Sequence, residues 1–446
     1  MAERTSMDTA AVVEKAFLVA VDTGDNPGWT AEESLAELGS LVETAGAQVV
    51  GAVYQKRDMV HPNLYLGTGK SEELKAVKAA TGFTVLVADD ELSPKQQRSL
   101  EKLLDVKVLD RSGVILDIFA QRARTHEGRL QVELAQLEYQ LPRLTRLWTH
   151  LSRTGGGIGT RGPGETQLET DRRVIRQRIK KMKERVAEVR RRRETAAATR
   201  DRRLLPGVAI VGYTNAGKST LLNALVGDVV VPAEDKLFAT LDPTSRRISL
   251  GDGQGVIVSD TVGFIHKLPH QLIDAFRATL EEVIRADVLL EVVDACDRHA
   301  SEHRRTVQGV LDELGAGGKP RVVVYNKVDL IEAGGGRFVP PRGEPHAVAV
   351  SAALGWGLDG LRDELAAVLA ELWVEVDVSL PYTAGELLAR VRERGAVEFE
   401  YRDRDVRVHG RVAPSLAGEL HAATRAWRRA LARSAGSAEP ALDNDD

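Results

Sequence analysis

The stretch Gly212-Tyr213-Thr214-Asn215-Ala216-Gly217-Lys218-Ser219-Thr220 decides how this 446-residue sequence is interpreted. An apolar run at 208–211 precedes it, and a helical pattern at 221–225 follows it. A glycine-bracketed loop between a buried strand and a helix is the context of a phosphate-binding P-loop. Gly212 and Gly217 let successive backbone N–H groups converge, and the helix dipole adds positive charge. We therefore predict that all nine residues bind a nucleotide, with Lys218 on the β- and γ-phosphates and Ser219 on Mg²⁺.

Three later motifs indicate that the nucleotide is GTP. Asp260-Thr261-Val262-Gly263 follows an apolar strand pattern; Asp260 is expected to hold Mg²⁺, and the Gly263 N–H to reach the γ-phosphate. Asn326-Lys327-Val328-Asp329 follows another such pattern. Asp329 can accept hydrogen bonds from guanine N1 and N2, a donor pair that adenine lacks, and Lys327 can lie over the base. The motif Ser351-Ala352 is expected to donate a backbone amide to guanine O6.

The interval before Asp260 is expected to contain switch I, Leu237-Phe238-Ala239-Thr240-Leu241-Asp242-Pro243-Thr244. In GTPases, a threonine of this segment completes the Mg²⁺ shell only when the γ-phosphate is present. Thr240 is the preferred candidate, and Thr244 is the alternative. We therefore predict that Mg²⁺ is bound by Ser219, Thr240 and Asp260. The catalytic residues are expected to be Lys218, Thr240 and Gly263.

Two residues bear on the rate of hydrolysis. Gly263 is followed by Phe264, where Ras-like GTPases carry a glutamine that orients the attacking water. Intrinsic hydrolysis is therefore expected to be slow. Asn215 could compensate if its carbonyl oxygen binds K⁺ beside the phosphates, and the alternative is that Asn215 only hydrogen-bonds switch I.

Length and composition narrow the class of protein. A 446-residue chain with 43% hydrophobic residues is expected to form about three domains. Cys296 is the only cysteine, which excludes a disulfide framework and a thiolate metal site and indicates a reducing compartment. No apolar run is long enough to span a bilayer, and no secretory signal is visible. A cytoplasmic monomer is therefore expected.

Positive charge is concentrated between residues 122 and 203, which hold 22 Lys and Arg against 10 Asp and Glu. Apolar residues in two parts of this region repeat in steps of three and four, which is typical of helices that pack along a seam. A solvated charged face or a flexible linker is the alternative, but the seams favour an antiparallel helical hairpin with arms of ~25–35 residues. Pro142 is expected to kink the first arm. The seam residues are Leu130, Leu134, Leu137, Leu141 and Leu144, then Ile175, Ile179, Met182, Val186 and Val189.

The tip of this hairpin is expected to be residues 155–164, a glycine-rich run that can be neither helix nor strand. Such a loop lets the backbone approach a phosphate-rich surface closely, and its arginines can pair with phosphates or stack on bases. Structured RNA is therefore the expected partner. The predicted RNA contacts are Arg153, Gly155, Gly156, Gly157, Gly159, Arg161, Gly162 and Gly164.

The pattern along the chain predicts an α/β protein. Strand and helix patterns alternate in residues 1–113, indicating an N-terminal parallel α/β domain. The helical hairpin (114–203), a Ras-like P-loop GTPase domain (204–372), a small α+β domain (373–433) and a disordered acidic tail (434–446) are expected to follow. The stretch Gly67-Thr68-Gly69-Lys70-Ser71 is similar to a second P-loop, but Leu64 stands where a glycine is required, so a turn before a helix is expected.

With these motifs placed, the chain resembles the HflX family of ribosome-associated GTPases from about residue 16 to 370. The resemblance implies GTP-dependent binding to the large ribosomal subunit, splitting of stalled ribosomes under stress, and contact of Arg153 and residues 155–164 with ribosomal RNA. It leaves open whether the N-terminal domain binds ATP. The segments that carry it are 109–112, 117–123, 131–137, 155–173, 212–219 and 237–244.

The expected function is therefore that of a GTPase that binds the large subunit in its GTP form, splits ribosomes, and leaves after hydrolysis to GDP and phosphate. Mass action requires the GTP form to bind the splitting-competent state more tightly than its alternatives. Two rivals stay open: a large-subunit assembly GTPase, and an RNA-remodelling ATPase in which GTP hydrolysis is incidental.

Overall fold

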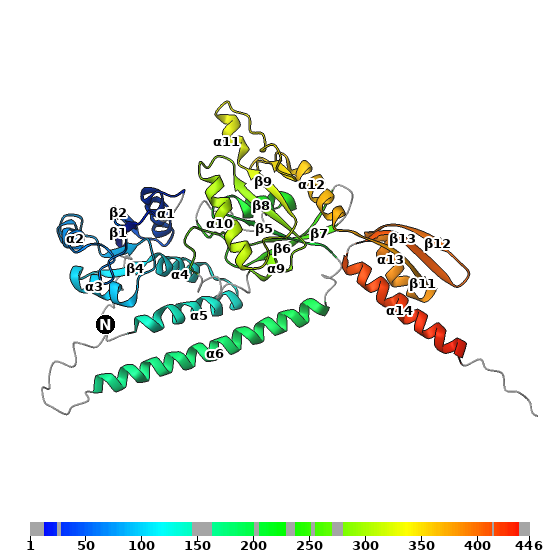
Figure 1. The fold of residues 1–446 in the computed structure, drawn as a ribbon, viewed down its shortest axis with the longest axis horizontal. Coiled ribbons are helices and arrows are strands. Elements are labelled where there is room, and N and C mark those ends of the chain that lie inside the picture. Colours follow the sequence, from blue (N-terminus) through cyan, green and yellow to red (C-terminus); the bar gives the residue numbers. More distant parts are fainter. Residues whose placement is uncertain are drawn as a thin grey trace, which may run out of the picture.

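The computed structural model describes residues 13–24, 28–144, 163–199, 205–228, 237–250, 255–269, 280–412 and 414–436. They form three β-sheets with helices around them. Figure 1 shows the N-terminal sheet, the central sheet and the C-terminal sheet in succession, with two long helices beneath the first two. The predicted α/β class is confirmed.

The N-terminal part alternates strands and helices around a four-stranded parallel sheet of order β2-β1-β3-β4. Helix α1 begins with a capping box, in which the Thr30 side chain accepts from the Glu33 amide and the Glu33 side chain accepts from the Thr30 amide. Helix α2 begins at Thr68, so the stretch similar to a P-loop is the first turn of the helix itself and not the expected turn before it. The elements are β1 (Lys15–Asp22), α1 (Ala31–Thr44), β2 (Gln48–Lys56), α2 (Thr68–Thr81), β3 (Val85–Ala88), α3 (Pro94–Leu104), β4 (Lys107–Asp110) and α4 (Arg111–Arg122).

Helices α5 (His126–Arg143) and α6 (Pro163–Thr199) lie side by side (Figure 1). Their buried contact contains Leu130, Leu134, Leu137, Ile179 and Met182, as the seam predicts. The first arm is shorter than expected, with 18 residues, because Pro142 falls in its last turn, where it cannot support a further turn. Helix α6 has 37 residues and begins at Pro163, so Gly164 is helical rather than part of a loop. Proline is well tolerated at a first helical position.

The central sheet has six strands in the order β10-β9-β8-β5-β7-β6, and all pairs are parallel except β6 with β7. The P-loop follows its central strand β5, so the nucleotide motifs meet at one edge of the sheet. The elements are β5 (Gly207–Gly212), α7 (Lys218–Val226), β6 (Thr244–Ser249), β7 (Gly255–Asp260), α9 (Glu281–Arg285), β8 (Val288–Asp294), α10 (Ala300–Glu313), β9 (Arg321–Asn326), α11 (Val328–Ala333), β10 (Ala347–Ala349) and α12 (Leu358–Glu371).

The C-terminal part is a three-stranded antiparallel sheet of order β11-β13-β12, packed against helices. Helix α14 extends to Gly436, so it contains the first three residues of the segment expected to be disordered, and residues 437–446 lie outside the described ones. The elements are β11 (Val374–Pro381), a 3₁₀ turn (Tyr382–Ala384), α13 (Gly385–Arg394), β12 (Ala396–Tyr401), β13 (Asp405–Val412) and α14 (Pro414–Gly436).

Candidate functional site

The P-loop joins β5 to α7, and its two glycines are required by close approaches. Gly212 has a φ of 149°, and a Cβ there would lie 2.3 Å from the Val292 carbonyl oxygen. Gly217 has a φ of 94°, and a Cβ there would lie 2.2 Å from Asn326 Nδ2. A side chain at either position would displace a neighbouring strand or loop. The sequence therefore folds here into the tight, amide-lined turn that anion binding needs.

The side-chain oxygens of the three predicted metal ligands converge beside the first turn of α7. The Ser219 hydroxyl donates to Asp260 Oδ2 at 2.7 Å and lies 2.7 Å from Thr240 Oγ1. Asp260 is fully buried, and its Oδ1 has no hydrogen-bond partner among the described residues. A cluster of hydroxyl and carboxylate oxygens with one carboxylate oxygen left unpaired fits Mg²⁺. Thr244, the alternative ligand, is instead the first residue of β6.

Lys218 is buried beneath the P-loop, where its Nζ donates to the Tyr213 carbonyl at 2.6 Å. Burial lowers the pKa of Lys218 to about 8, although the charge of Asp260 opposes the shift. Burial raises the pKa of Asp260, opposed by the Ser219 hydrogen bond and by Lys218. Burial thus favours the neutral form of both groups, and the attraction between them opposes this effect.

Gly263 lies against the P-loop, where a Cβ would be 2.9 Å from the Thr214 Cα and 3.0 Å from Lys218 Nζ. The next residue, Phe264, is 1% exposed and packs into the core that the N-terminal and central sheets share. Its backbone is held by hydrogen bonds to Gly212 and Thr214, of 3.1 and 2.8 Å. The Phe264 side chain therefore fills the core and cannot orient water, as its sequence position predicts.

The base-reading motif is assembled on the other side of the P-loop. Asn326 donates to the Ala216 carbonyl at 2.9 Å and accepts from the Ala352 amide at 3.0 Å, so it ties three loops together. The Ala352 amide, expected to donate to guanine O6, is engaged with Asn326 in this structure. Lys327 forms a 2.8 Å ion pair with Asp294. The other predicted residues of this motif are Asp329, half-buried in the first turn of α11, and Ser351, which is fully buried.

The predicted nucleotide residues also line a common pocket. It is bordered by the P-loop from Thr214 to Thr220, by Phe238–Thr240 of switch I, and by Thr261 and Gly263. Asn215, the residue considered for K⁺, has a φ of 59° and is exposed at this pocket. The structure thus brings together the phosphate and metal residues that the sequence predicts.

Comparison with known proteins decides the family. The chain is 47% identical over 410 residues to GTPase HflX of Lacrimispora saccharolytica, covering 92% of this chain and 96% of the relative. The chain belongs to the GTPase HflX family. It is also 45% identical over 378 residues to GTPase HflX of Escherichia coli, covering 84% and 88% of the two chains. As a member of this family, the protein is a GTP hydrolase.

Three protein-family profiles match successive segments of the chain. Residues 32–120 match a GTP-binding GTPase N-terminal region, residues 122–200 a GTP-binding GTPase middle region, and residues 207–327 a 50S ribosome-binding GTPase. A solved GTP-binding protein of Sulfolobus solfataricus in complex with GDP is 24% identical, covers 80% of this chain and 98% of its own, and has a TM-score of 0.40. Among the described residues of this HflX family GTPase, no helix is long and apolar enough to cross a membrane.

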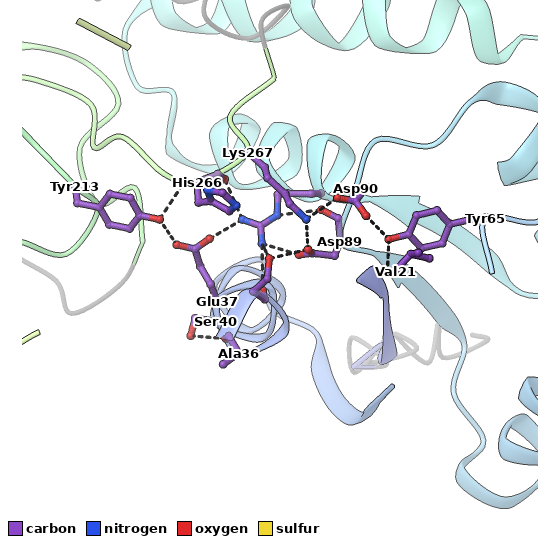
Figure 2. A network of polar contacts seen from close by, with 12 residues as sticks. Val21, Ala36, Glu37, Ser40, Tyr65, Asp89, Asp90, Tyr213, His266 and Lys267 are labelled. Atoms are coloured by element: carbon purple, nitrogen blue, oxygen red, sulfur yellow. Dashed lines mark hydrogen bonds and ion pairs between the residues drawn. The ribbon is translucent and has the colours of Figure 1, made fainter. Parts of the chain in front are cut away.

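Sequence reasoning missed a polar network that joins the nucleotide domain to the N-terminal domain. Figure 2 shows Tyr213 of the P-loop against Glu37 of α1, and Lys267 against Asp89 and Asp90. The Tyr213 hydroxyl donates to Glu37 and accepts from the His266 amide at 2.8 Å. Lys267 contacts both aspartates at 2.5 Å. The segment after Gly263 is therefore held by N-terminal residues.

At the centre of this network lies Arg111, the first residue of α4, which is 1% exposed. It contacts Glu37 and Asp89 at 2.6 Å each and donates to the His266 carbonyl at 3.1 Å. Burial alone would lower the pKa of Arg111, but the charges of Asp89 and Glu37 raise it. The sequence contains one signal for Arg111: it follows the end of the parallel strand β4, and ligands in such sheets bind beyond the carboxyl ends of the strands.

The predicted RNA contacts are outside the part of the chain that the structure describes, with one exception. Gly164 is the second residue of α6. The remaining predicted contacts, Arg153, Gly155, Gly156, Gly157, Gly159, Arg161 and Gly162, fall in residues 145–162, which the structure leaves undescribed.

Proposed function

We propose that this HflX family GTPase binds the large ribosomal subunit when GTP is bound and splits stalled or stressed ribosomes into subunits. Hydrolysis of GTP to GDP and phosphate then releases it. The match of residues 207–327 to the profile of a 50S ribosome-binding GTPase supports the ribosomal partner. We also propose that the protein acts as a cytoplasmic monomer.

The observation that carries this proposal is the exposed basic face of α6. The helix has 37 residues and is therefore about 55 Å long. Its apolar seam is buried against α5, so its lysines and arginines lie on the exposed side of the helix. A long helix with an exposed basic face can lie along RNA phosphates. The exposed basic residues are Arg173, Arg176, Arg178, Lys180, Lys181, Lys183, Arg185 and Arg191.

Two of these side chains are occupied by acidic residues of α5. Arg178 pairs with Glu133, and Lys183 pairs with Glu138 at 2.8 Å. We propose that the exposed lysines and arginines of α6 together provide the positive charge that contacts RNA. We propose that the glycine loop at 155–164 and Arg153 extend this contact, since they continue the same basic region along the chain.

For hydrolysis, we propose that Ser219, Thr240 and Asp260 hold Mg²⁺ and that Lys218 contacts the β- and γ-phosphates. When bound, Mg²⁺ neutralises charge on the phosphate oxygens. The Gly263 amide is proposed to contact the γ-phosphate, and Asn326, Lys327, Asp329, Ser351 and Ala352 to form the guanine site. Because Phe264 is buried in the core, hydrolysis by the protein alone is slow.

A cation test addresses the role proposed for Asn215. If its carbonyl oxygen binds K⁺ beside the phosphates, hydrolysis is faster in K⁺ than in Na⁺, and Asn215→Ala removes the difference. Equal rates of the wild-type protein in the two salts would contradict this role.

The ribosomal proposal is tested by sedimentation with purified large subunits. The protein is expected to sediment with them in a non-hydrolysable GTP analogue but not in GDP or an ATP analogue. Replacing Arg173, Arg176 and Lys180 by Glu should abolish co-sedimentation, because each change reverses an exposed charge. The matched control replaces the exposed Arg425, Arg428 and Arg429 of α14 by Glu. Wild-type co-sedimentation of the α6 variant would contradict the proposal, and preference for immature subunits would favour the assembly function.

A further inference from the structure

The carboxylate of Asp242, at the end of switch I, lies on the first turn of α5. Its Oδ2 accepts from the backbone amides of Arg124 and Thr125, both at 2.9 Å. Its Oδ1 accepts from the Thr125 hydroxyl at 2.5 Å. One side chain of the nucleotide domain therefore receives three hydrogen bonds from Arg124 and Thr125, which we call the root of α5.

These contacts form a helix cap in two steps. Thr125 is the N-cap residue of α5, and its hydroxyl oxygen accepts from the Gly128 amide at 3.0 Å. The Thr125 hydroxyl thus receives a hydrogen bond from the helix and donates one to Asp242. A carboxylate at a helix N-terminus is also favoured by the helix dipole. The Asp242 carboxylate therefore lies at the positive end of the α5 dipole.

The approach of the two segments depends on a small residue in α5. Gly128 is buried, and a Cβ there would lie 2.4 Å from Asp242 Oδ1. Any larger residue at this position would push the carboxylate away from Thr125. The fit between switch I and α5 is consequently specific to this pair of segments.

A second anchor holds the other end of the same segment. Phe238 is 2% exposed, adopts a φ of 54°, and packs edge-on against Phe119 of α4, with ring centroids 4.7 Å apart. A positive φ at a bulky residue is costly and persists only where surrounding contacts enforce it. Thr240 lies between the two anchors, with its Oγ1 2.7 Å from Ser219 Oγ. The α4–α5 corner therefore fixes both sides of the threonine.

We propose that Asp242 is a positioning residue of the GTPase site, which holds Thr240 at the metal position by capping α5. This inference rests on the proposed assignment of Thr240 as a Mg²⁺ ligand. In GTPases whose switch I is ordered only by the γ-phosphate, the nucleotide alone positions the threonine. Here the N-terminus of α5 helps to position it. By linkage, whatever moves the root of α5 changes the Mg²⁺-dependent affinity for GTP, and the converse also holds.

The test uses the full-length protein and a fluorescent, non-hydrolysable GTP analogue. For each variant, the Mg²⁺ concentration that gives half of the maximal binding is measured, together with the Kd for fluorescent GDP without Mg²⁺. Amide hydrogen exchange of residues 237–242 and 125–130 is measured in parallel on the nucleotide-free protein. Asp242→Ala removes the acceptor, Thr125→Val removes the hydroxyl, and Thr125→Ser keeps it. The matched control is Asp359→Ala, since the side chain of Asp359 is 97% exposed on α12.

Asp242→Ala and Thr125→Val should each raise the half-saturating Mg²⁺ concentration about tenfold, as expected for the loss of hydrogen bonds to a charged group. The double variant should be no worse than either single one, because both remove one interaction. Hydrogen exchange should accelerate in both segments. Thr125→Ser and Asp359→Ala should behave as wild type, and the Kd for GDP without Mg²⁺ should be unchanged in all variants.

Three results would overturn the inference. If Thr240→Ala raises the Mg²⁺ requirement and Asp242→Ala does not, the positioning role is wrong while the assignment of Thr240 stands. If Asp242→Ala has an effect and Thr125→Val has none, the link to α5 is wrong. If Thr240→Ala itself leaves the Mg²⁺ requirement unchanged, the proposed metal site is wrong, and the inference fails with it.

Discussion

The guanidinium of Arg111 lies 2.6 Å from the carboxylate of Asp89, and both side chains are 1% exposed. Burial would raise the pKa of Asp89, but Arg111 and Lys267 lower it well below its usual range. The Asp89 carboxylate is therefore ionised inside the protein and depends on these two cations. Because Lys267 follows Gly263 by four residues, the same ion pairs connect the nucleotide site to the N-terminal sheet.

Replacing Arg111 by Met should strongly destabilise the protein. The substitution removes one of the two cations that contact the buried Asp89 and leaves Lys267, and removing one partner of a buried ion pair costs about 3–5 kcal/mol. Urea unfolding midpoints would measure the loss. The matched control is Arg407→Met, which breaks a pair with Asp377 on the surface of the C-terminal sheet and should cost much less, because water screens an exposed ion pair. Equal losses in the two variants would contradict the role of the Arg111 network.

Acid should weaken the fold partly through His266. Burial and then the charges of Arg111 and Lys267 lower the pKa of this imidazole from 6.5 to about 4. Below pH 6.5 the unfolded chain takes up the proton and the folded protein does not, so stability from this group is lost as the pH falls toward 4. His266→Phe keeps the stacking on Trp29, with ring centroids 4.7 Å apart, without a titrating group.

The variant should therefore lose less stability than the wild type between pH 7 and about pH 5, as measured by urea midpoints. His409→Phe, at an exposed position of β13, is the matched control for replacing a histidine by phenylalanine. A His266→Phe variant with the wild-type pH dependence would show that this imidazole is not held neutral.

Nucleotide binding should take up a proton at Lys218. With a pKa of about 8, its amine is partly neutral at pH 8, and bound phosphates favour the charged form. Calorimetry of GTP binding in two buffers of different ionisation enthalpy should report uptake of about half a proton at that pH. Uptake should vanish near about pH 6, where the amine is already charged. Heats that are the same in both buffers at the higher pH would rule out a depressed pKa at Lys218.

Guanine selection is expected to depend on Asp329. Asp329→Asn replaces one acceptor oxygen by an amide donor, which fits the C2 carbonyl of xanthine and opposes the N2 donor of guanine. The variant should lose affinity for GTP by about tenfold or more and gain affinity for xanthosine triphosphate, both measured by competition. Leu330→Ala, at the neighbouring position with 58% exposure, is the control. An unchanged preference for GTP would contradict the assignment of Asp329 to guanine recognition.

The nucleotide site could be predicted from sequence because each of its motifs follows a strand of one parallel sheet. The carboxyl ends of such strands share an edge, so the P-loop, Asp260 and Asn326 meet without knowledge of the rest of the fold. The hairpin was predictable for a similar reason, since its apolar period marks the two faces that pack. Local patterns thus define these elements.

The contacts between domains could not be predicted in this way. Glu37, Arg111 and Lys267 come from three distant segments, and no spacing in the chain indicates that they meet. The sequence places Asp242 in switch I but does not predict its hydrogen bonds, because these depend on where α5 begins in space. Phe264 was recognised by the glutamine it replaces, whereas its burial in the shared core required the structure.

The measurement that tests the central claim most directly is a sucrose gradient of mature ribosomes incubated with the protein. With a non-hydrolysable GTP analogue, the wild-type protein should convert ribosomes to separate subunits, and with GDP it should not. A variant lacking residues 155–164 should bind the nucleotide normally and leave the ribosomes intact. Ribosomes that stay intact with the wild-type protein and the analogue, or that are fully split by the deletion variant, would contradict the account.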